Sequence, residues 1–420
     1  MESIMRERRA GNWVRISLFN LLVVSLFGLL MRYKIVFSLP GLNQKFLLHA
    51  HSHFAFGGWV SLLLMVLMVR ALPASVPGKY ARHFHRLLIA WLVCAYGMLV
   101  TFTLQGYAFA SILFSTAAVV LSFVFAISYF RALKAVPGLA GARWLKAALV
   151  WNMLSAIGTS CLSLLMATHT ANQEAYLASI YWYLHFQYNG WFFFACMGLF
   201  IRYLHARNIA LPGEKMVFGL FLWSCLPAYG LSVLWLKLPA AAIAIAGMSA
   251  VAQALGWSLL LRGIFRSMRQ LLPQLSKLSA MMLSVAGLAF TVKIILQLAS
   301  ADPSLSTIAF GSRTIVITYL HLVLLVGISL FLMGLVVAEG LLPVSRYVQA
   351  GAVAFTAGVV LNELLLAAQS IGGLLYFPLP GIFESLLGVS VLMSAGLGMM
   401  NAGWTRVARL QALPVHAGKQ

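Results

Sequence analysis

The sequence predicts an all-α fold, a polytopic membrane helix bundle of about twelve transmembrane helices with both termini in the cytoplasm. Hydrophobic residues make up 62% of the 420 residues and charged residues only 9%, whereas a soluble domain carries roughly 25% charged residues to cover its surface. Most of this surface must therefore face lipid, which excludes soluble, disordered and coiled-coil proteins. No soluble domain or long linker separates the apolar runs, so we expect residues 1–420 to form one integral membrane domain.

Each predicted helix is a run of about 20 apolar residues, the length that crosses a bilayer, bounded by polar or proline-containing breaks. The runs cover residues 14–37, 46–69, 87–106, 108–130, 146–168, 177–201, 216–236, 239–261, 279–299, 314–338, 347–369 and 382–404. Of the 29 Lys and Arg residues, 23 fall on the side of the N-terminus and 5 on the other side. Because cytoplasmic loops collect basic residues, this asymmetry places both termini inside.

The net charge of +21 therefore reflects membrane topology and does not indicate a nucleic-acid partner. The expected environment is the lipid bilayer of a bacterial cytoplasmic membrane.

Histidines on three different spans form the main candidate site. His53, His185 and His321 lie on the second, sixth and tenth spans, each about seven or eight residues from the outer helix end, or roughly 10–12 Å deep. An imidazole inside a membrane needs a partner or a metal, and haem iron and copper both accept it. His49 and His51 precede His53 in the same helix. At helical spacing His49 and His53 share one face, and His51 points away from them.

These positions predict two sites. The favoured axial ligands of a low-spin haem are His53 and His321, with His49 and His51 as alternates on the second span. His185 together with His49 or His51 is the candidate ligand set for a second metal, for which copper is the expected ion.

Other polar residues inside the predicted spans are candidates for proton or propionate contacts. Glu363 and Lys293 mark a proton path, a contact to a haem propionate or an ion pair with each other. Tyr188, one turn after His185, and Tyr319, two residues before His321, are in position to give a hydrogen bond near a metal.

Twelve spans with histidines on the second, sixth and tenth resemble subunit I of the haem-copper oxidase and nitric oxide reductase superfamily. The segment YLHLVLLVGISLFLMG (319–334) is similar to the family's tenth helix, and FAFGG (54–58) resembles the segment after the low-spin haem ligand of the C-family oxidases. His185 stands where the family places a copper ligand. The resemblance implies haem binding by His321, electron transfer or chemistry on nitric oxide or dioxygen, and a cytochrome or quinone as electron donor.

The chain also departs from that family. Tyr319 stands where the family has the ligand of its high-spin haem, and the span at 216–236 contains no histidine pair for copper. The resemblance therefore implies an intact low-spin haem site beside a modified or missing binuclear centre, and it leaves open whether the protein is an oxidoreductase.

Two other functions fit parts of the sequence. The segment HAHSHFAFGG (49–58) resembles the NnrS-type membrane proteins, which implies haem and copper in a nitric oxide response. Twelve spans also suit a transporter without haem, although we find no repeat between residues 1–210 and 211–420 of the kind that many transporters contain.

Overall fold

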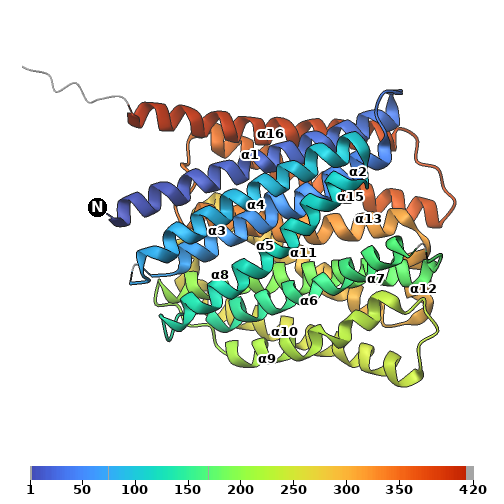
Figure 1. The fold of residues 1–420 in the computed structure, drawn as a ribbon, viewed down its shortest axis with the longest axis horizontal. Coiled ribbons are helices and arrows are strands. Elements are labelled where there is room, and N and C mark those ends of the chain that lie inside the picture. Colours follow the sequence, from blue (N-terminus) through green and yellow to red (C-terminus); the bar gives the residue numbers. More distant parts are fainter. Residues whose placement is uncertain (1, 74, 169, 413–420) are drawn as a thin grey trace, which may run out of the picture.

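The computed structural model describes residues 2–73, 75–168 and 170–412, and within these ranges the chain is helical, without strands, apart from turns and short loops (Figure 1). The α-helices are α1 (Glu2–Val36), α2 (Gln44–Phe54), α3 (Leu62–Ala71), α4 (Gly78–Gln105), α5 (Phe109–Lys134), α6 (Ala142–Ala167), α7 (Gln173–His185), α8 (Phe193–His205), α9 (Glu214–Cys225), α10 (Ala240–Leu271), α11 (Lys277–Ala299), α12 (Pro303–Gly311), α13 (Arg313–His321), α14 (Leu330–Ala338), α15 (Arg346–Leu374) and α16 (Ile382–Ala412). Three π-helices, η1 (Ala55–Ser61), η2 (Phe186–Phe192) and η5 (Leu322–Ser329), and two 3-10 helices, η3 (Pro227–Val233) and η4 (Leu272–Gln274), complete the described chain.

Ten of the predicted spans are helices long and apolar enough to cross a membrane. The seventh is bent by 49° between α9 and η3 and makes an eleventh if both pieces are one crossing. Pro227 at the start of η3 accounts for the bend, because proline lacks the N–H that would continue the hydrogen-bond ladder. The sixth is helical from Gln173 to His205, but Gln187 and Asn189 in its middle make it less apolar. The all-helical class is confirmed, and the count of twelve is not.

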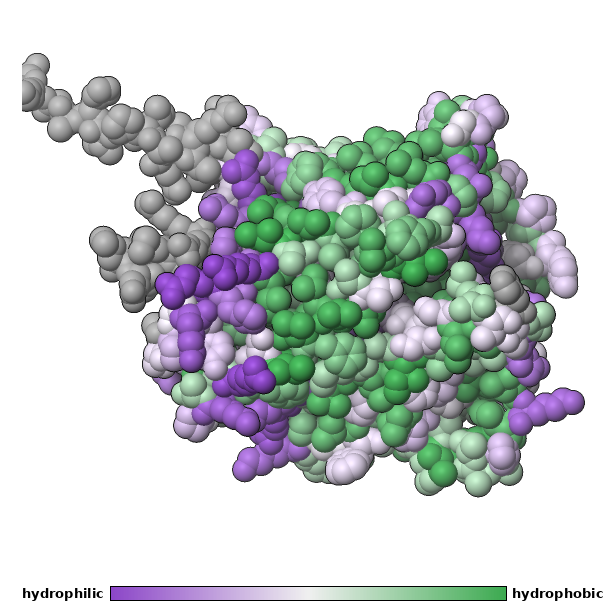
Figure 2. Space-filling model, in the orientation of Figure 1, coloured by the Kyte–Doolittle hydropathy of each residue, from purple (hydrophilic) through white to green (hydrophobic). Residues whose placement is uncertain are grey.

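The surface of the bundle has an apolar band between two polar ends (Figure 2). Large apolar side chains are exposed within the spans, among them Val93, Val120, Leu255, Ile295 and Leu364. Contiguous exposure of this kind marks a lipid-facing surface. In Figure 1, α1 begins and α16 ends at one end of the bundle, here called the terminal end. The helices α2, α7 and α13 begin at the other end, here called the distal end.

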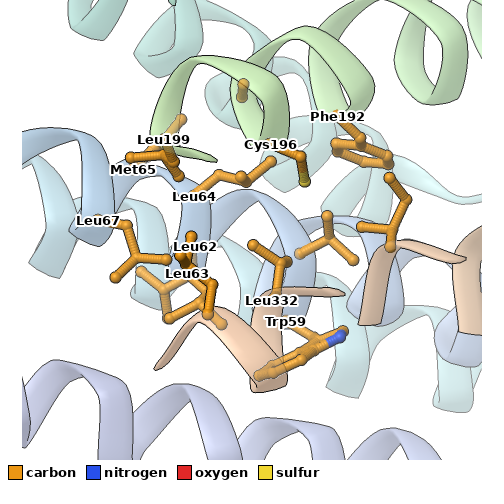
Figure 3. Packing of buried hydrophobic residues seen from close by; sticks show 14 of the residues in the cluster. Trp59, Leu62, Leu63, Leu64, Met65, Leu67, Phe192, Cys196, Leu199 and Leu332 are labelled. Carbon is orange, nitrogen blue, oxygen red and sulfur yellow. The ribbon is translucent and has the colours of Figure 1, made fainter. Parts of the chain in front are cut away.

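Three helical segments form the centre of the bundle, and we call them the core segments: α2 to α3, α7 to α8 and α13 to α14. In the most apolar stretches of the first and third, 83% and 72% of the residues are buried, compared with 28–44% in the other spans. In the second, every residue from 185 to 200 is buried. Side chains of all three meet in Figure 3, with Leu64 from α3, Leu199 from α8 and Leu332 from α14. The remaining helices surround this core and face the lipid.

Each core segment contains a π-helix in its middle. The π-helices η2 and η5 begin directly after His185 and His321, and η1 begins after α2, which carries His49, His51 and His53. Indole N–H groups connect the π-helices across the core. The Trp59 indole donates to Ser329 Oγ at 2.9 Å, and that of Trp191 donates to Ser61 Oγ at 3.2 Å. π-Helices are rare in proteins as a whole, and those that occur are often found at functional sites. Three of them in one core therefore indicate that the core segments carry the function.

The described helices repeat the same arrangement three times along the chain, whereas the sequence analysis compared only two halves, residues 1–210 and 211–420. The helices 2–134, 142–271 and 277–412 each contain four main helical segments, and the second segment of each unit is a core segment with a π-helix. Neighbouring units meet through α5 with α6, α10 with α11 and α16 with α1, which closes the ring. Two of the units share a sequence signal. The segment HFAFGGW (53–59) matches HFQYNGW (185–191) at His, Phe, Gly and Trp.

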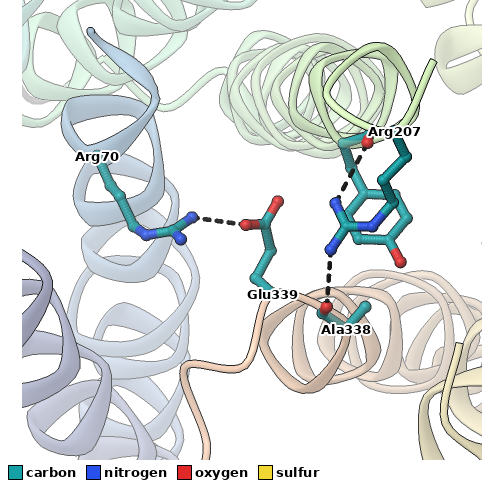
Figure 4. A network of polar contacts seen from close by, with 5 residues as sticks. Arg70, Arg207, Ala338 and Glu339 are labelled. Atoms are coloured by element: carbon teal, nitrogen blue, oxygen red, sulfur yellow. Dashed lines mark hydrogen bonds and ion pairs between the residues drawn. The ribbon is translucent and has the colours of Figure 1, made fainter. Parts of the chain in front are cut away.

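A polar network ties the core segments together at the terminal end (Figure 4). Arg70, in the last turn of α3, donates to Glu339 Oε2 at 2.7 Å, just past the end of α14. Arg207, just past α8, donates to the carbonyl oxygen of Ala338 at 3.1 Å and lies 3.6 Å from the centre of the Tyr203 ring. Charged hydrogen bonds of this kind are stronger than neutral ones when partly shielded from water. The terminal ends of all three core segments are therefore held in one arrangement.

Candidate functional site

His51 and His321 lie on α2 and α13, and their imidazoles are close enough to interact electrostatically. His51 Nδ1 lies 3.0 Å from the carbonyl oxygen of Val24 in α1, and His321 Nδ1 lies 2.8 Å from that of Ile317, one turn earlier in α13. Because a carbonyl oxygen only accepts hydrogen bonds, Nδ1 carries the proton in both rings. Nε2 is then the nitrogen available to a metal. A carbonyl partner on the opposite nitrogen is the contact that commonly orients a ligating histidine.

His49 and His53 lie on the other face of α2, as their spacing predicts. His53 Nε2 lies 3.0 Å from the hydroxyl oxygen of Tyr107, in the turn after α4. The His49 ring meets the Tyr107 ring edge-on, with ring centres 4.7 Å apart. His53, the favoured partner of His321 from the sequence, therefore faces the turn after α4. The ring near His321 is that of the alternate candidate, His51.

The helix α1 adds two residues to the surroundings of His51. The guanidinium of Arg32 lies within electrostatic range of both His51 and His321. Gly28, one turn before Arg32, lies against the His51 ring, and a Cβ atom at this position would be 3.4 Å from His51 Cε1. A haem carries two propionates, and a guanidinium matches carboxylate geometry better than any other side chain. Imidazoles and a guanidinium are the side chains that a haem would need for its iron and its propionates, and this part of the bundle holds both kinds.

Both ring nitrogens of His185 are occupied. The side chain is 1% exposed. Nε2 donates to the carbonyl oxygen of Cys225 at 2.8 Å, and Nδ1 accepts from Asn189 Nδ2 at 3.1 Å. Across residues 2–73, 75–168 and 170–412, no three His, Cys, Asp or Glu side chains lie close enough to hold one metal ion. Both His185 nitrogens are thus engaged in hydrogen bonds, and a second metal held by His185 with His49 or His51 stays a prediction.

Lys293 in α11 is buried, with 4% of its surface exposed, and it contacts amides rather than a carboxylate. Its ammonium donates to Gln297 Oε1, and Gln297 Nε2 donates to Gln253 Oε1 in α10 at 2.8 Å. The Lys293 side chain lines a small cavity together with Asn189, the residue that contacts His185. The place expected for a second metal therefore holds a network of imidazole, amides and one ammonium group.

Glu363 in α15 is not paired with Lys293, so the predicted ion pair between them is wrong. Its Oε2 atom is buried without a hydrogen-bond partner within the described chain, and so is Nδ2 of the neighbouring Asn362. Lys293 instead directs its ammonium toward Gln297. The suggestion that Glu363 carries protons stays a prediction.

Tyr188 and Tyr319 link two core segments. Their ring centres lie 6.0 Å apart in an edge-on arrangement. Tyr188 is in η2, and Tyr319 is two residues before His321 in α13. The two tyrosines therefore bring η2 and α13 into contact close to His321.

Arg32 and Gly28 are the site residues that the sequence did not single out. Arg32 is one of only five basic residues on the outer side by the predicted topology, and the scarcity of basic residues there is the signal that could have found it. Gly28 carries no such signal, because its role depends on which helix packs against α2.

The structure defines an all-helical integral membrane protein with His51 and His321 on two of its three core segments. No protein-family model and no curated protein sequence matches this chain.

Proposed function

We propose that this chain is a haem-binding membrane protein that transfers electrons, with His51 and His321 as the axial ligands of a low-spin haem. One observation carries the proposal: each imidazole donates its Nδ1 proton to a backbone carbonyl, which leaves Nε2 free for iron. The proposal agrees with the low-spin site that the resemblance to the haem-copper oxidase superfamily implies. It differs from the sequence-based choice in replacing His53 by His51.

The chain itself supplies ligation, orientation and shielding, and a bound haem supplies one-electron transfer between its ferrous and ferric states. The carbonyl oxygens of Val24 and Ile317 hold the two imidazoles in one tautomer and one orientation. Ligands held in this way would need little rearrangement when a bound haem gains or loses an electron. Arg32 would hold a propionate and offset its charge.

Electron transfer is supported better than reduction of nitric oxide or dioxygen at this site. Gas reduction requires an open coordination position or a second metal, and two axial imidazoles fill both positions of a haem iron. The ring nitrogens of His185 are both engaged in hydrogen bonds. A cytochrome or a membrane quinone is the expected electron donor, and the expected location is a bacterial cytoplasmic membrane.

The direct test is the spectrum of the protein purified in detergent from haem-replete cells. We expect one haem per chain in a pyridine haemochrome assay, a reduced-minus-oxidised spectrum of the low-spin type and no change on addition of carbon monoxide. Protein that is folded but contains no haem would overturn the proposal. A carbon monoxide adduct would show that the iron has an open coordination position, and it would favour reduction of nitric oxide or dioxygen over electron transfer.

Replacing Arg32 by Met is expected to lower the midpoint potential of the haem. Removing a nearby positive charge favours the ferric state, which is the more positive of the two. For charges about 10 Å apart at an effective dielectric constant of about 20, Coulomb's law gives about 1.7 kcal/mol, equivalent to about 70 mV for one electron. A redox titration measures the shift.

The control for this titration is Arg32→Lys, which keeps the charge and should shift the potential much less. Equal potentials in wild type and Arg32→Met would place Arg32 away from the haem.

A further inference from the structure

A second group of ligand-type atoms lies at the distal end, on the face of α2 that the proposed haem does not use. His49 Nε2 is buried and has no hydrogen-bond partner within the described chain. His53 Nε2 lies 3.0 Å from the Tyr107 hydroxyl, and the His49 ring meets the same tyrosine ring at 4.7 Å. The Phe102 ring covers the group, 4.3 Å from the His53 ring centre and 6.2 Å from that of His49.

We propose that His49, His53 and Tyr107 form a binding site for one divalent transition-metal ion of the imidazole-preferring kind, such as Cu²⁺ or Zn²⁺. Two histidines one helical turn apart present both rings to one ion from a rigid element. The buried, unpartnered nitrogen of His49 is the observation that points to a missing ligand, because buried polar atoms in folded proteins are nearly always satisfied. This site is separate from the haem of the proposed function.

The distance between two of the proposed ligand atoms suits tetrahedral coordination. Ligand atoms about 2.0–2.1 Å from a metal in tetrahedral geometry are about 3.3 Å from each other. The separation of 3.0 Å between His53 Nε2 and the Tyr107 oxygen is close to that value. Tyr107 contributes a phenol oxygen as the third ligand, beside the two imidazoles of His49 and His53.

Tyr107 also connects the site to the distal surface. It lies in the turn between α4 and α5, and 38% of the residue is exposed. A phenol keeps its proton at pH 7 in the absence of a metal, and metal binding would release it. Lys45 interacts electrostatically with His49, and its side chain is exposed to solvent, where its repulsion is screened.

Copper(II) is the probe that tests the site in the full-length protein. Purified protein is stripped with a chelator and titrated with Cu²⁺, and the bound metal is counted and examined by electron paramagnetic resonance. We expect one tight equivalent per chain with hyperfine coupling to two imidazole nitrogens. His49→Gln and His53→Gln should each weaken binding at least tenfold, and Tyr107→Phe should weaken it by less.

The matched control is His51→Gln, on the same helix but on the opposite face. It should bind copper as the wild type does and lose haem, whereas His49→Gln and His53→Gln should keep haem and lose copper. Wild-type copper affinity in His49→Gln and His53→Gln, or a wild-type signal without two coupled nitrogens, would overturn the site. Because the wild-type signal is read without any substitution, misfolding of a variant leaves the test intact. Failure of the haem proposal would appear in the haem content alone.

Discussion

Replacing His51 or His321 by Ala is expected to lower the haem content of the purified protein at least tenfold. Each substitution removes one of the two proposed bonds from imidazole to iron. A tenfold loss of haem affinity corresponds to only about 1.4 kcal/mol, which is much less than such a bond contributes. Haem that remains should be high-spin, because one axial position is then vacant. The measurements are the pyridine haemochrome assay per chain and the oxidised absorption spectrum.

The control for this result is His53→Ala, which removes the same side chain two residues away on the opposite face of α2. It should keep wild-type haem content and a low-spin spectrum. The reverse outcome, with haem lost in His53→Ala and kept in His51→Ala, would show that the ligand is His53. His185→Ala should also keep the haem, because the His185 nitrogens bind Cys225 and Asn189.

Replacing Gly396 by Val is expected to destabilise the bundle strongly. At the crossing of α15 and α16, a Cβ atom on Gly396 would lie 2.7 Å from the carbonyl oxygen of Gly351 and 2.7 Å from the amide nitrogen of Phe355. Backbone atoms cannot yield as the end of a flexible side chain does, so the two helices must separate. Overpacking costs typically 1–3 kcal/mol, and helix crossings in membranes depend on small residues for close approach. We expect a loss of about 3 kcal/mol or more.

The measurement is the temperature at which half of the detergent-solubilised protein stays monodisperse after heating. The control is Gly398→Val, two residues further along α16, where a Cβ atom would meet nothing within 4 Å. Equal thermal midpoints for the two variants would mean that α15 and α16 do not cross at Gly396.

Much of the bundle could be predicted from the sequence, because a run of 20 apolar residues has few stable forms other than a membrane helix. The prediction of membrane helices from hydropathy was weakest for the helices in the centre of the bundle. The sixth span is buried within protein rather than in lipid, so it tolerates Gln187 and Asn189, and its hydropathy is lower than its position suggests. A helix with protein neighbours on all sides does not need the apolar surface of a lipid-facing one.

The choice between His51 and His53 shows why the site could be predicted only in part. Helical spacing correctly separated the two faces of α2, but spacing does not tell which neighbour packs on each face. That depends on α1 and α13 lying on one side and the turn at Tyr107 on the other, which only the tertiary fold decides. The same limit explains the wrong pairing of Lys293 with Glu363, since both lie in membrane helices but no spacing rule relates them.

The π-helices have a consequence for how the site can change over evolutionary time. One residue turns an α-helix by about 100°, so a gain or loss of a single residue in η1 would rotate the distal half of its core segment against the terminal half. The three histidines of α2 would then face new neighbours, while Arg70 and the packed residues of α3 stayed in place. The insertion or deletion of one codon could therefore change which histidine faces α1 and which faces Tyr107. The rest of the protein would not need to change.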